Sequence, residues 1–406
     1  MTGKMRPIRD TVAFDDALRQ IIASTPRMTR TERVPLAGAV GRVLAVDVTS
    51  RGDVPPFDRA AMDGYAVVAA DTFGAGKFEP RTLACVETVF TGRVPTRTLA
   101  RGQCAEIATG APMPDGADAV VMVEETDKDE DGTVRIFTPV YPGQHVGRRG
   151  ADIKATQTIL ESGSLLNPSR VGALAATGVA EVDVFERPRL AILSTGDEIV
   201  DPGQPLGPGQ IHDINRYTLA AIIELHGGVA VPHKTAADDV NDLGPAVDAC
   251  LGEDVVVFSG GSSVGERDLV MDVLEAKGEV RFHGIAVKPG KPTVFGLIQG
   301  RPVLGMPGYP TSCLSNAYML LVPMLRHMAR LPPHAPTTRS LPLGQRIVST
   351  TGRHQFFTVR IVDGRVVPAF KASGDITSMS QADGYVEIPA QTDIVEKDEI
   401  VEVRLL

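Results

Sequence analysis

The sequence predicts a multidomain chain of α/β plus β structure, in which residues 181–331 form a doubly wound, mostly parallel α/β domain. From Arg189 to about Leu331, apolar strand-like segments alternate with segments of helical periodicity, a pattern typical of parallel sheets. On either side of this region the chain reads mainly as short strands, which indicates separate β-rich domains. A length of 406 residues also favours two to four domains over one core.

The first element expected is an amphipathic helix, because apolar residues recur at helical spacing: Phe14, Ala17, Leu18, Ile21 and Ile22. Short strands follow at residues 65–69, 83–90, 104–108, 119–124 and 134–140. We interpret the acidic run of residues 124–131 as a solvated hairpin tip. A second helix is marked by Asn167 as N-cap, Pro168 at its first position and Gly178 just beyond its end.

Within the α/β region, strands are expected at residues 190–193, 229–232, 255–258 and 303–304. Helices are expected at residues 216–226, 240–251, 269–277 and 311–328. The Pro-rich segment after Leu331 is interpreted as a linker. The remaining strands, with a hairpin turn at Asp363-Gly364, predict a small C-terminal β-barrel or sandwich.

The composition excludes several classes of function. The net charge is −9 and no basic stripe with interleaved aromatics occurs, so we expect no nucleic-acid partner. The four scattered cysteines form no C-x-x-C pair, which argues against structural zinc and suits a reducing cytoplasm. Because no signal-peptide core and no apolar run of about 20 residues is present, a cytoplasmic protein without a membrane partner is expected.

Three glycine-bearing loops follow predicted strands, at residues 194–198, 259–268 and 305–310. Loops that leave the carboxyl ends of strands in an open α/β sheet converge on one crevice. Glycine lets backbone N–H groups approach a phosphate, and carboxylates such as Glu198 and Asp268 hold Mg²⁺. The candidate binding positions in these loops are Thr195, Gly196, Asp197, Ser259, Gly260, Gly261, Ser262, Gly265, Pro307 and Gly308.

Between the last two loops lies the segment Lys288-Pro289-Gly290-Lys291-Pro292, which places two cations on stiff backbone. Lysine on a rigid loop is a binder of phosphate or another oxyanion. Together with the glycine loops, this segment indicates chemistry on a phosphorylated small molecule.

Each of these segments also has a purely structural interpretation. Thr195 or Asp197 can cap the next element, Asp268 can be an ordinary N-cap, and the lysine segment can be a surface turn. The segments at residues 55–65 and 148–152 can be a domain-crossing loop and a charged turn. We interpret His212, Tyr217 and His283 as surface or packing residues.

Taken together, these segments resemble the MoeA-type molybdenum insertases, the molybdopterin molybdenumtransferases, a family that includes the gephyrin E domain. The resemblance is carried by PPFDRAAMDGYAV (55–67), RRGADI (148–153), STGDE (194–198), GQIHDIN (209–215), SGGSSVGERD (259–268), KPGKP (288–292), MPGYP (306–310) and SGDITSMSQADGY (373–385). These motifs run in family order over nearly the whole chain, which makes the match far more specific than any single loop.

The resemblance implies transfer of molybdenum from molybdate into adenylylated molybdopterin, with Mg²⁺ and release of AMP. It implies metal-site acids at Asp63, Asp152, Glu198, Asp238 and Asp268. By the same resemblance, Asp63, Glu198, Asp268, Lys288 and Lys291 would be catalytic, and Arg149, Pro289, Gly290 and Ser373 would join the loop residues in binding substrate.

The resemblance also implies a homodimer with four domains per chain and a site shared between chains. The expected boundaries are an elongated dimerisation domain of residues 1–50 and 141–180, a small β-rich domain of residues 51–140, the α/β domain of residues 181–331 and a β-barrel of residues 332–406. One departure is Tyr309, where the family has Asn. Asn tolerates a left-handed turn that Tyr adopts at higher cost, so the backbone of this loop is an open question.

Two other functions stay open on the sequence. The first is a molybdopterin adenylyltransferase, since the α/β domain resembles that of the adenylyltransferases too. The second is a non-catalytic scaffold homologue, which the retained acids Asp63, Glu198 and Asp268 argue against.

Overall fold

The computed structural model describes residue 8 and residues 10–235, 240–260 and 269–406. The chain divides into two compact units, a main unit of residues 1–32 and 185–406 and an inserted unit of residues 33–184. Strands β1 (Thr31–Pro35) and β12 (Glu181–Phe185) pair with each other where the chain passes between the units. The described residues up to Glu32 thus belong with the α/β region, although the resemblance implied an elongated domain that includes residues 1–50. The other boundaries of the four-domain division stay a prediction.

A six-stranded sheet forms the centre of the main unit, in the order β16 (Val229–Pro232), β13 (Arg189–Ser194), β17 (Val255–Ser259), β21 (Arg301–Met306), β20 (Val294–Ile298) and β18 (Glu279–His283). The first three pairings are parallel and the last two antiparallel. Strands β18 and β20 were not predicted. Gln299 and Gly300, both at positive φ (51° and 75°), form the tight turn between β20 and β21, and Gln-Gly is a weak hairpin signal.

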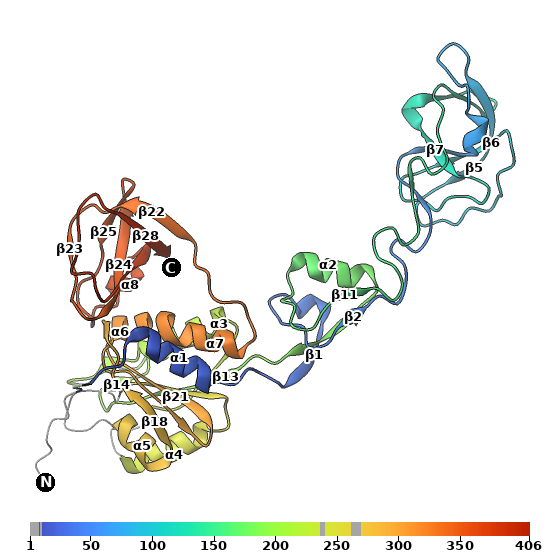
Figure 1. Ribbon diagram of the computed structural model, residues 1–406. Coiled ribbons are helices and arrows are strands. Elements are labelled where there is room, and N and C mark those ends of the chain that lie inside the picture. The colour runs from blue at the N-terminus through green and yellow to red at the C-terminus, as the bar shows by residue number, and fades with distance from the viewer. Residues whose placement is uncertain (1–7, 9, 236–239, 261–268) are drawn as a thin grey trace, which may run out of the picture. The chain divides into compact units, whose positions relative to one another are not determined.

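Helices cover both faces of this sheet, as Figure 1 shows. One face carries α1 (Phe14–Ser24), α3 (Asn215–Leu225), α6 (Pro310–Asn316) and α7 (Val322–Met328), and the other carries α4 (Val240–Cys250) and α5 (Leu269–Lys277). Successive residues of a strand point to opposite faces, so Leu190 and Ile192 join the first core while Ala191 and Leu193 join the second. The helix expected at residues 311–328 is interrupted by a π-helical segment, Ala317–Leu321.

The C-terminal part of the main unit is a second six-stranded sheet that contains β22 (Thr338–Pro342), β24 (His354–Val362), β25 (Arg365–Pro368), β26 (Gly384–Ile388) and β28 (Ile400–Leu405). A bridge between Leu343 and Val366 brings the chain after β22 to β25, which closes the circuit of strands. The Asp363-Gly364 turn joins β24 to β25 as predicted, with both residues at positive φ. Shorter elements complete this part: β23 (Ile347–Val348), β27 (Ile394–Val395) and α8 (Thr377–Ser380).

The sixth strand of that sheet, β19 (Val287–Lys288), comes from the α/β region and pairs in parallel with β24. The α/β region and the C-terminal β region therefore share backbone hydrogen bonds. This pairing places the lysine-bearing segment beside the C-terminal sheet.

The inserted unit contains a six-stranded sheet in the order β7 (Ala119–Met122), β4 (Gly64–Val67), β6 (Gln103–Ile107), β5 (Arg81–Val89), β9 (Thr133–Ile136) and β8 (Thr126–Lys128). Helix α2 (Pro168–Ala176) begins as predicted, because the Asn167 side chain accepts a hydrogen bond from the Arg170 amide at 2.9 Å. Short ladders join β2 (Val48–Thr49) to β11 (Thr158–Leu160) and β3 (Arg59–Ala60) to β10 (Val146–Gly147). The acidic run, predicted as a hairpin tip, also contains β8, whose Asp127 pairs with Arg135.

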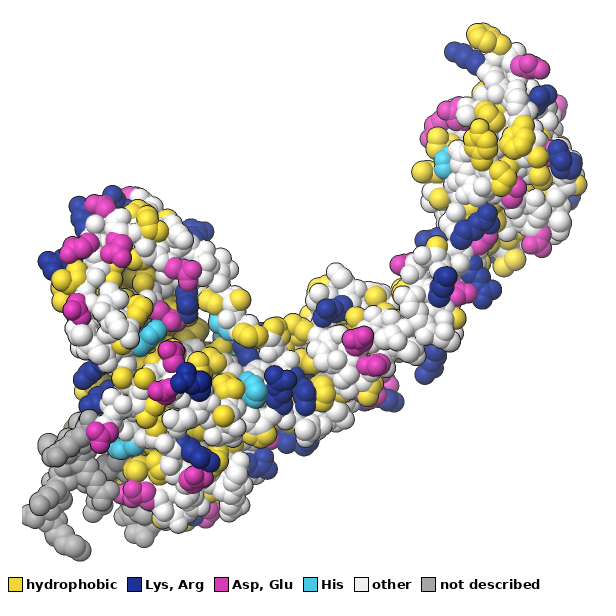
Figure 2. Space-filling view, viewed as in Figure 1, with side chains coloured by type: hydrophobic (Ala, Val, Ile, Leu, Met, Phe, Trp, Pro, Cys, Tyr) yellow, Lys and Arg dark blue, Asp and Glu magenta, His cyan; other side chains and the backbone are white. Residues whose placement is uncertain are grey.

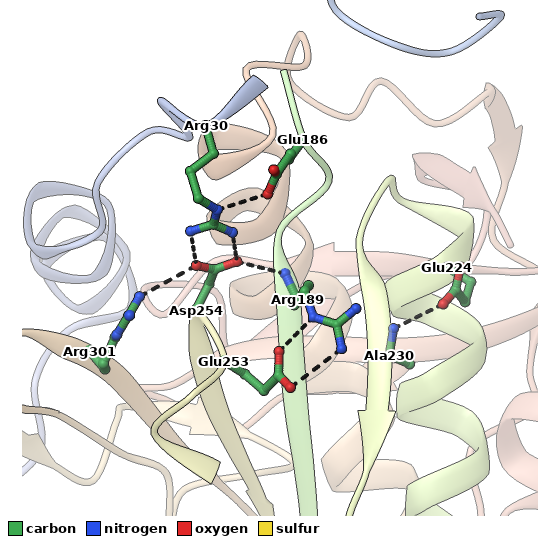
Figure 3. A network of polar contacts seen from close by, with 8 residues as sticks. All are labelled: Arg30, Glu186, Arg189, Glu224, Ala230, Glu253, Asp254 and Arg301. Atoms are coloured by element: carbon green, nitrogen blue, oxygen red, sulfur yellow. Dashed lines mark hydrogen bonds and ion pairs between the residues drawn. The ribbon is translucent and has the colours of Figure 1, made fainter. Parts of the chain in front are cut away.

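A network of charged groups fixes the main unit where β1 and β12 leave it (Figure 3). The buried carboxylate of Asp254 accepts two hydrogen bonds of 2.8 Å from the Arg30 guanidinium and one of 2.9 Å from the Arg189 amide. Arg30 also donates to Glu186, directly after β12. Burial alone would raise the pKa of Asp254, but the hydrogen bonds from Arg30 and Arg189 hold it below its usual range.

Apolar side chains also lie on the surface of the inserted unit, where Figure 2 shows them gathered around its β-rich end. Phe78 and Val94 are almost fully exposed, and the ring of Phe73 lies 6.2 Å from that of Tyr141.

Among the helices described, none combines the length and the apolar character that crossing a bilayer requires.

Candidate functional site

The three predicted loops start from one row of residues at the carboxyl ends of parallel strands. Ser194 at the end of β13 pairs in register with Ser259 at the end of β17, and Ser259 pairs with Met306 at the end of β21. The amide of Thr195 donates to the Ser259 carbonyl at 3.1 Å. The loops after these strands therefore begin side by side, as the sequence predicted.

Two glycines are required where these loops meet. Gly260 has φ +96°, and a Cβ there would lie 2.7 Å from the carbonyl oxygen of Thr195. Gly196 has φ +136°, and a Cβ there would lie 2.6 Å from the carboxylate of Glu198. A side chain at position 260 would push the first two loops apart, so glycine there maintains their close approach, whereas at position 196 it is the positive φ that favours glycine.

Glu198 lies exposed at the rim of a cleft, just before the short strand β14 (Ile199–Val200). The element after Asp197 is thus a strand, so the interpretation of Thr195 or Asp197 as a helix cap is wrong. The helix that follows, α3, is capped by Asp213, whose carboxylate accepts the Arg216 amide at 3.0 Å and the Ser194 hydroxyl at 2.6 Å.

The lysine segment forms another wall of the cleft. Lys288 Nζ donates to Thr350 Oγ1 at 2.8 Å, and Lys291 Nζ donates to the Ile8 carbonyl at 2.7 Å. Between them, Gly290 has φ +102° and rests on the buried side chain of Asn316, which donates to the Gly290 carbonyl at 2.9 Å. The segment is therefore built into the fold and is not a surface turn.

The cleft has a volume of about 1560 Å³ and brings together most of the residues predicted in the main unit. Those that line it are Thr195, Glu198, Ser259, Gly260, Lys288, Pro289, Gly290, Lys291, Pro307, Gly308 and Ser373. A pocket of this size accommodates a substrate larger than a single nucleotide. Gly196 and Asp197 stand in the same turn as Thr195 and Glu198.

Residues that are not among the predicted site residues also line the cleft, among them Arg353, Asn215 and Ser312. His212, on the short strand β15 (Ile211–His212), had been interpreted as a surface or packing residue and lines the cleft as well. Asn215 donates to the Gly308 carbonyl at 2.8 Å and so fixes the third loop. The signal for Asn215 was present in GQIHDIN, whereas Arg353 stands in no motif.

Tyr309 also lines the cleft, and the question about its backbone is resolved. It has φ −68° and ψ 128° as the N-cap of α6, which is ordinary extended backbone and not the left-handed turn considered above. Its side chain is 65% exposed. Tyr in place of Asn therefore imposes no backbone strain here.

The C-terminal loop contributes to the cleft through Ser373, whose carbonyl accepts the Thr311 amide at 3.1 Å. The Thr311 hydroxyl donates to the carbonyl of Asp375 at 2.9 Å. These bonds tie the loop to the first turn of α6, at the end of the third glycine loop.

Three predicted site residues belong to the inserted unit. Asp63 is exposed before β4 and accepts the Thr109 amide at 2.7 Å. Arg149 pairs with Asp53 at 2.6 Å, and the pKa of Asp53 is lowered by the Ala155 amide and by Arg149. Asp152 lines a separate cavity of about 470 Å³ within this unit.

Five predicted positions lie outside the described residues: Asp238, Gly261, Ser262, Gly265 and Asp268. Among the described residues, no group of three or more acids, histidines or cysteines forms a preassembled metal site. Mg²⁺ in nucleotide sites commonly takes only one or two carboxylates and completes its shell with phosphate oxygens and water. Glu198, in the same cleft as two lysines, fits a Mg²⁺ ion that arrives with substrate phosphates.

An α/β sheet with glycine loops, cations and an acid around a cleft at its carboxyl end defines a protein that binds a phosphorylated small molecule. Comparison with protein families identifies the family to which this chain belongs. Residues 12–178 match the MoeA N-terminal region (domain I and II), residues 191–327 a probable molybdopterin binding domain, and residues 340–406 the MoeA C-terminal region (domain IV).

Relatives along the whole chain agree. Molybdopterin molybdenumtransferase 2 of Mycobacterium tuberculosis is 36% identical over 389 residues, covering 93% of this chain and 95% of that protein. The molybdopterin molybdenumtransferase of Haemophilus influenzae is 36% identical over 80% of each chain. The crystal structure of a molybdopterin biosynthesis MoeA protein from Pyrococcus horikoshii superposes with a TM-score of 0.84 at 40% identity, covering 98% of this chain and 99% of that one.

The chain belongs to the MoeA family. It is an enzyme of molybdenum cofactor biosynthesis, of the molybdopterin molybdenumtransferase class.

Proposed function

We propose that this enzyme transfers molybdenum from molybdate into adenylylated molybdopterin and releases AMP, with Mg²⁺, in the cytoplasm. The observation that carries the proposal is the single cleft that holds Lys288, Lys291, Arg353 and Glu198 among glycine loops. Tetrahedral molybdate and a phosphoanhydride are both oxyanions, and fixed ammonium and guanidinium groups replace the water around such groups.

The residues have distinct roles in this proposal. Lys288, Lys291 and Arg353 bind molybdate and phosphate oxygens and hold them at fixed positions. The turns at Gly196 and Gly260 shape the edge of the cleft at which Thr195, Glu198 and Ser259 face the substrate. Glu198 would hold Mg²⁺, which when bound neutralises charge on the leaving phosphate.

We further propose that the enzyme is a homodimer in which the acid Asp63 of one chain completes the cleft of the other. Asp63 belongs to the inserted unit, while Glu198 and Lys288 belong to the main unit. An acid supplied in this way would add a second carboxylate to the one that Glu198 provides, which is the number that Mg²⁺ sites on nucleotides commonly use.

The test is to incubate the purified protein with adenylylated molybdopterin, molybdate and Mg²⁺, and to measure AMP and protein-bound molybdenum. Transfer is expected with one AMP per molybdenum and without added ATP. Glu198→Ala and Asp63→Ala are each expected to abolish it while the circular dichroism spectrum stays unchanged. Release of pyrophosphate from ATP, without any molybdenum transfer, would instead identify an adenylyltransferase and reject the proposal.

A further inference from the structure

The two lysines of the cleft differ from several other cations of this protein in what they contact. Arg30, Arg189 and Lys277 each pair with a carboxylate. Within the part of the chain that the structure describes, Lys288 and Lys291 have only neutral oxygen partners, a hydroxyl and a backbone carbonyl. Among the described residues, therefore, no carboxylate pairs with either ammonium group.

The partner of Lys288 belongs to a well-anchored turn of the C-terminal β region. The Thr350 carbonyl accepts the Arg353 amide at 3.3 Å, and the Gly352 amide donates to the Ala390 carbonyl at 2.8 Å. On the preceding residue, the Ser349 hydroxyl donates to the buried side chain of Gln355 at 2.7 Å. The same turn thus carries both the acceptor for Lys288 and the cation Arg353, which lines the cleft.

Backbone pairing fixes the other side of this contact. Strand β19 pairs with β24 so that Lys288 stands opposite Gln355. The pairing of β19 with β24 therefore fixes the backbone of Lys288 relative to the turn that contains Thr350. The distance between the two residues does not depend on a flexible loop.

A neutral acceptor has a specific physical effect on a lysine. A free lysine side chain has many rotamers, and ordering them on ligand binding lowers affinity. One hydrogen bond to Thr350 orders the chain beforehand, and the other two N–H donors of the ammonium stay available. A carboxylate would order the lysine equally well but would compete with an anionic ligand for its charge.

We propose that Thr350 is a positioning residue that orients Lys288 toward the oxyanion substrate, an arrangement that rests on the proposed function for the identity of that substrate. The C-terminal β region thereby contributes three residues to the active site: Thr350 through its hydroxyl group, Arg353 and Ser373. The Ile8 carbonyl has the corresponding role for Lys291, and the bridge between Val12 and Ile285 holds that segment in place.

The first test is independent of turnover. Thr350→Val removes the acceptor at nearly constant shape, Thr350→Ser keeps it, and Thr351→Val removes the neighbouring hydroxyl, which donates to Asp393. Trace acetylation with acetic anhydride, read by mass spectrometry, should show Lys288 about threefold more reactive in Thr350→Val only, since a hydrogen bond to a charged group is lost. Equal reactivity of Lys288 in all three variants and the wild type would overturn the proposal.

The second test is a double-mutant cycle on molybdenum transfer. Thr350→Val is expected to lower kcat/KM for molybdate about five- to tenfold, with recovery in Thr350→Ser, but to have no further effect in a Lys288→Ala background. Equal losses in both backgrounds would show that Thr350 does not act through Lys288, and the proposal would be wrong. If the wild type transfers no molybdenum, the proposed function fails, while the acetylation result still decides the role of Thr350.

Discussion

Arg353 enters the cleft from the turn that precedes β24, and within the described chain its guanidinium has no carboxylate partner. Arg353→Ala should raise the KM for molybdate about tenfold or more, because a hydrogen bond to a charged group contributes about 1.5–3 kcal/mol. Steady-state kinetics at varied molybdate measures this. Arg346→Ala, which removes an exposed arginine that pairs with Glu396, is the matched control and should leave KM unchanged. An unchanged KM for molybdate in Arg353→Ala would show that Arg353 does not bind molybdate.

Gly290 is the residue on which the geometry of the lysine segment depends most. A Cβ at Gly290 would lie 2.4 Å from the Asn316 amide group, and its φ of +102° is strained for an L side chain. Gly290→Ala should therefore lower the free energy of unfolding by about 3 kcal/mol or more, because overpacking adds to backbone strain.

Gly352→Ala is the matched control, since Gly352 also has positive φ (+79°) but nothing within 4 Å of its Cβ position. Gly352→Ala should lower the free energy of unfolding by only about 1–2 kcal/mol, the strain of a left-handed backbone conformation. Urea unfolding followed by far-ultraviolet circular dichroism measures both, because the chain has no tryptophan to report by fluorescence. Equal losses in the two variants would show that the Asn316 contact has no energetic role.

Single residues of the site could be predicted only where a local pattern marked them. Lys288, Lys291 and Glu198 stand in short motifs beside Gly or Pro, and these motifs have a physical meaning by themselves. Arg353 does not, because the pairing of β19 with β24 brings it to the cleft, and a single arginine before a strand carries no signal. Which side chains of the inserted unit act in the site stays a prediction.

At the scale of elements, the charged network at the amino ends of β13 and β17 makes a testable contribution to stability. Asp254 has a side chain only 7% exposed and faces two arginines, Arg30 and Arg301. Asp254→Asn should destabilise the protein by about 2 kcal/mol at pH 7, because the hydrogen bonds from the Arg30 guanidinium and the Arg189 amide lose their charged acceptor. The exposed pair of Asp398 with Arg365 is the control, and Asp398→Asn should lower the free energy of unfolding far less, because solvent screens this pair.

The contribution of Asp254 to the free energy of unfolding depends on pH, and the direction of its pKa shift gives the sign of that dependence. The pKa of Asp254 is lowered in the folded protein, so its contribution is complete above the unfolded pKa of about 4 and is lost as the pH falls through the folded value. The difference in stability between wild type and Asp254→Asn should therefore narrow below about pH 4. A difference that stays constant down to pH 2 would show that packing, and not charge, is responsible.

The elements that the sequence predicted well are those with strong periodicity or marked ends. Helices α1, α2 and α5 and strands β16 and β17 begin within one or two residues of their expected positions. The antiparallel strands β18 and β20 were both missed, β20 because the Gln299-Gly300 turn that joins it to β21 is a weak hairpin signal. Strand β19 was missed because two residues are too few to show alternation. Missing β19 had the largest consequence for the predicted fold, since β19 joins the α/β region to the C-terminal β region.

At the scale of the whole molecule, a site shared between chains predicts a result that no single variant gives. Co-expressed with different tags, Asp63→Ala and Glu198→Ala chains would form mixed dimers. If each cleft takes Asp63 from the partner chain, one site of such a dimer carries both substitutions and the other carries none. The purified mixed dimer should therefore recover about half of the wild-type activity, although each parent is inactive.

The converse pairing gives the opposite outcome and serves as control. A dimer of one wild-type chain with one Asp63→Ala/Glu198→Ala chain has one substitution in each shared site, so it should be inactive. If the site instead lies within one chain, the wild-type chain keeps its activity and this dimer retains about half, while the first mixed dimer stays inactive. The two dimers thus exchange their activities between the two arrangements, and because both carry the same two substitutions, a difference in folding or expression cannot produce that exchange.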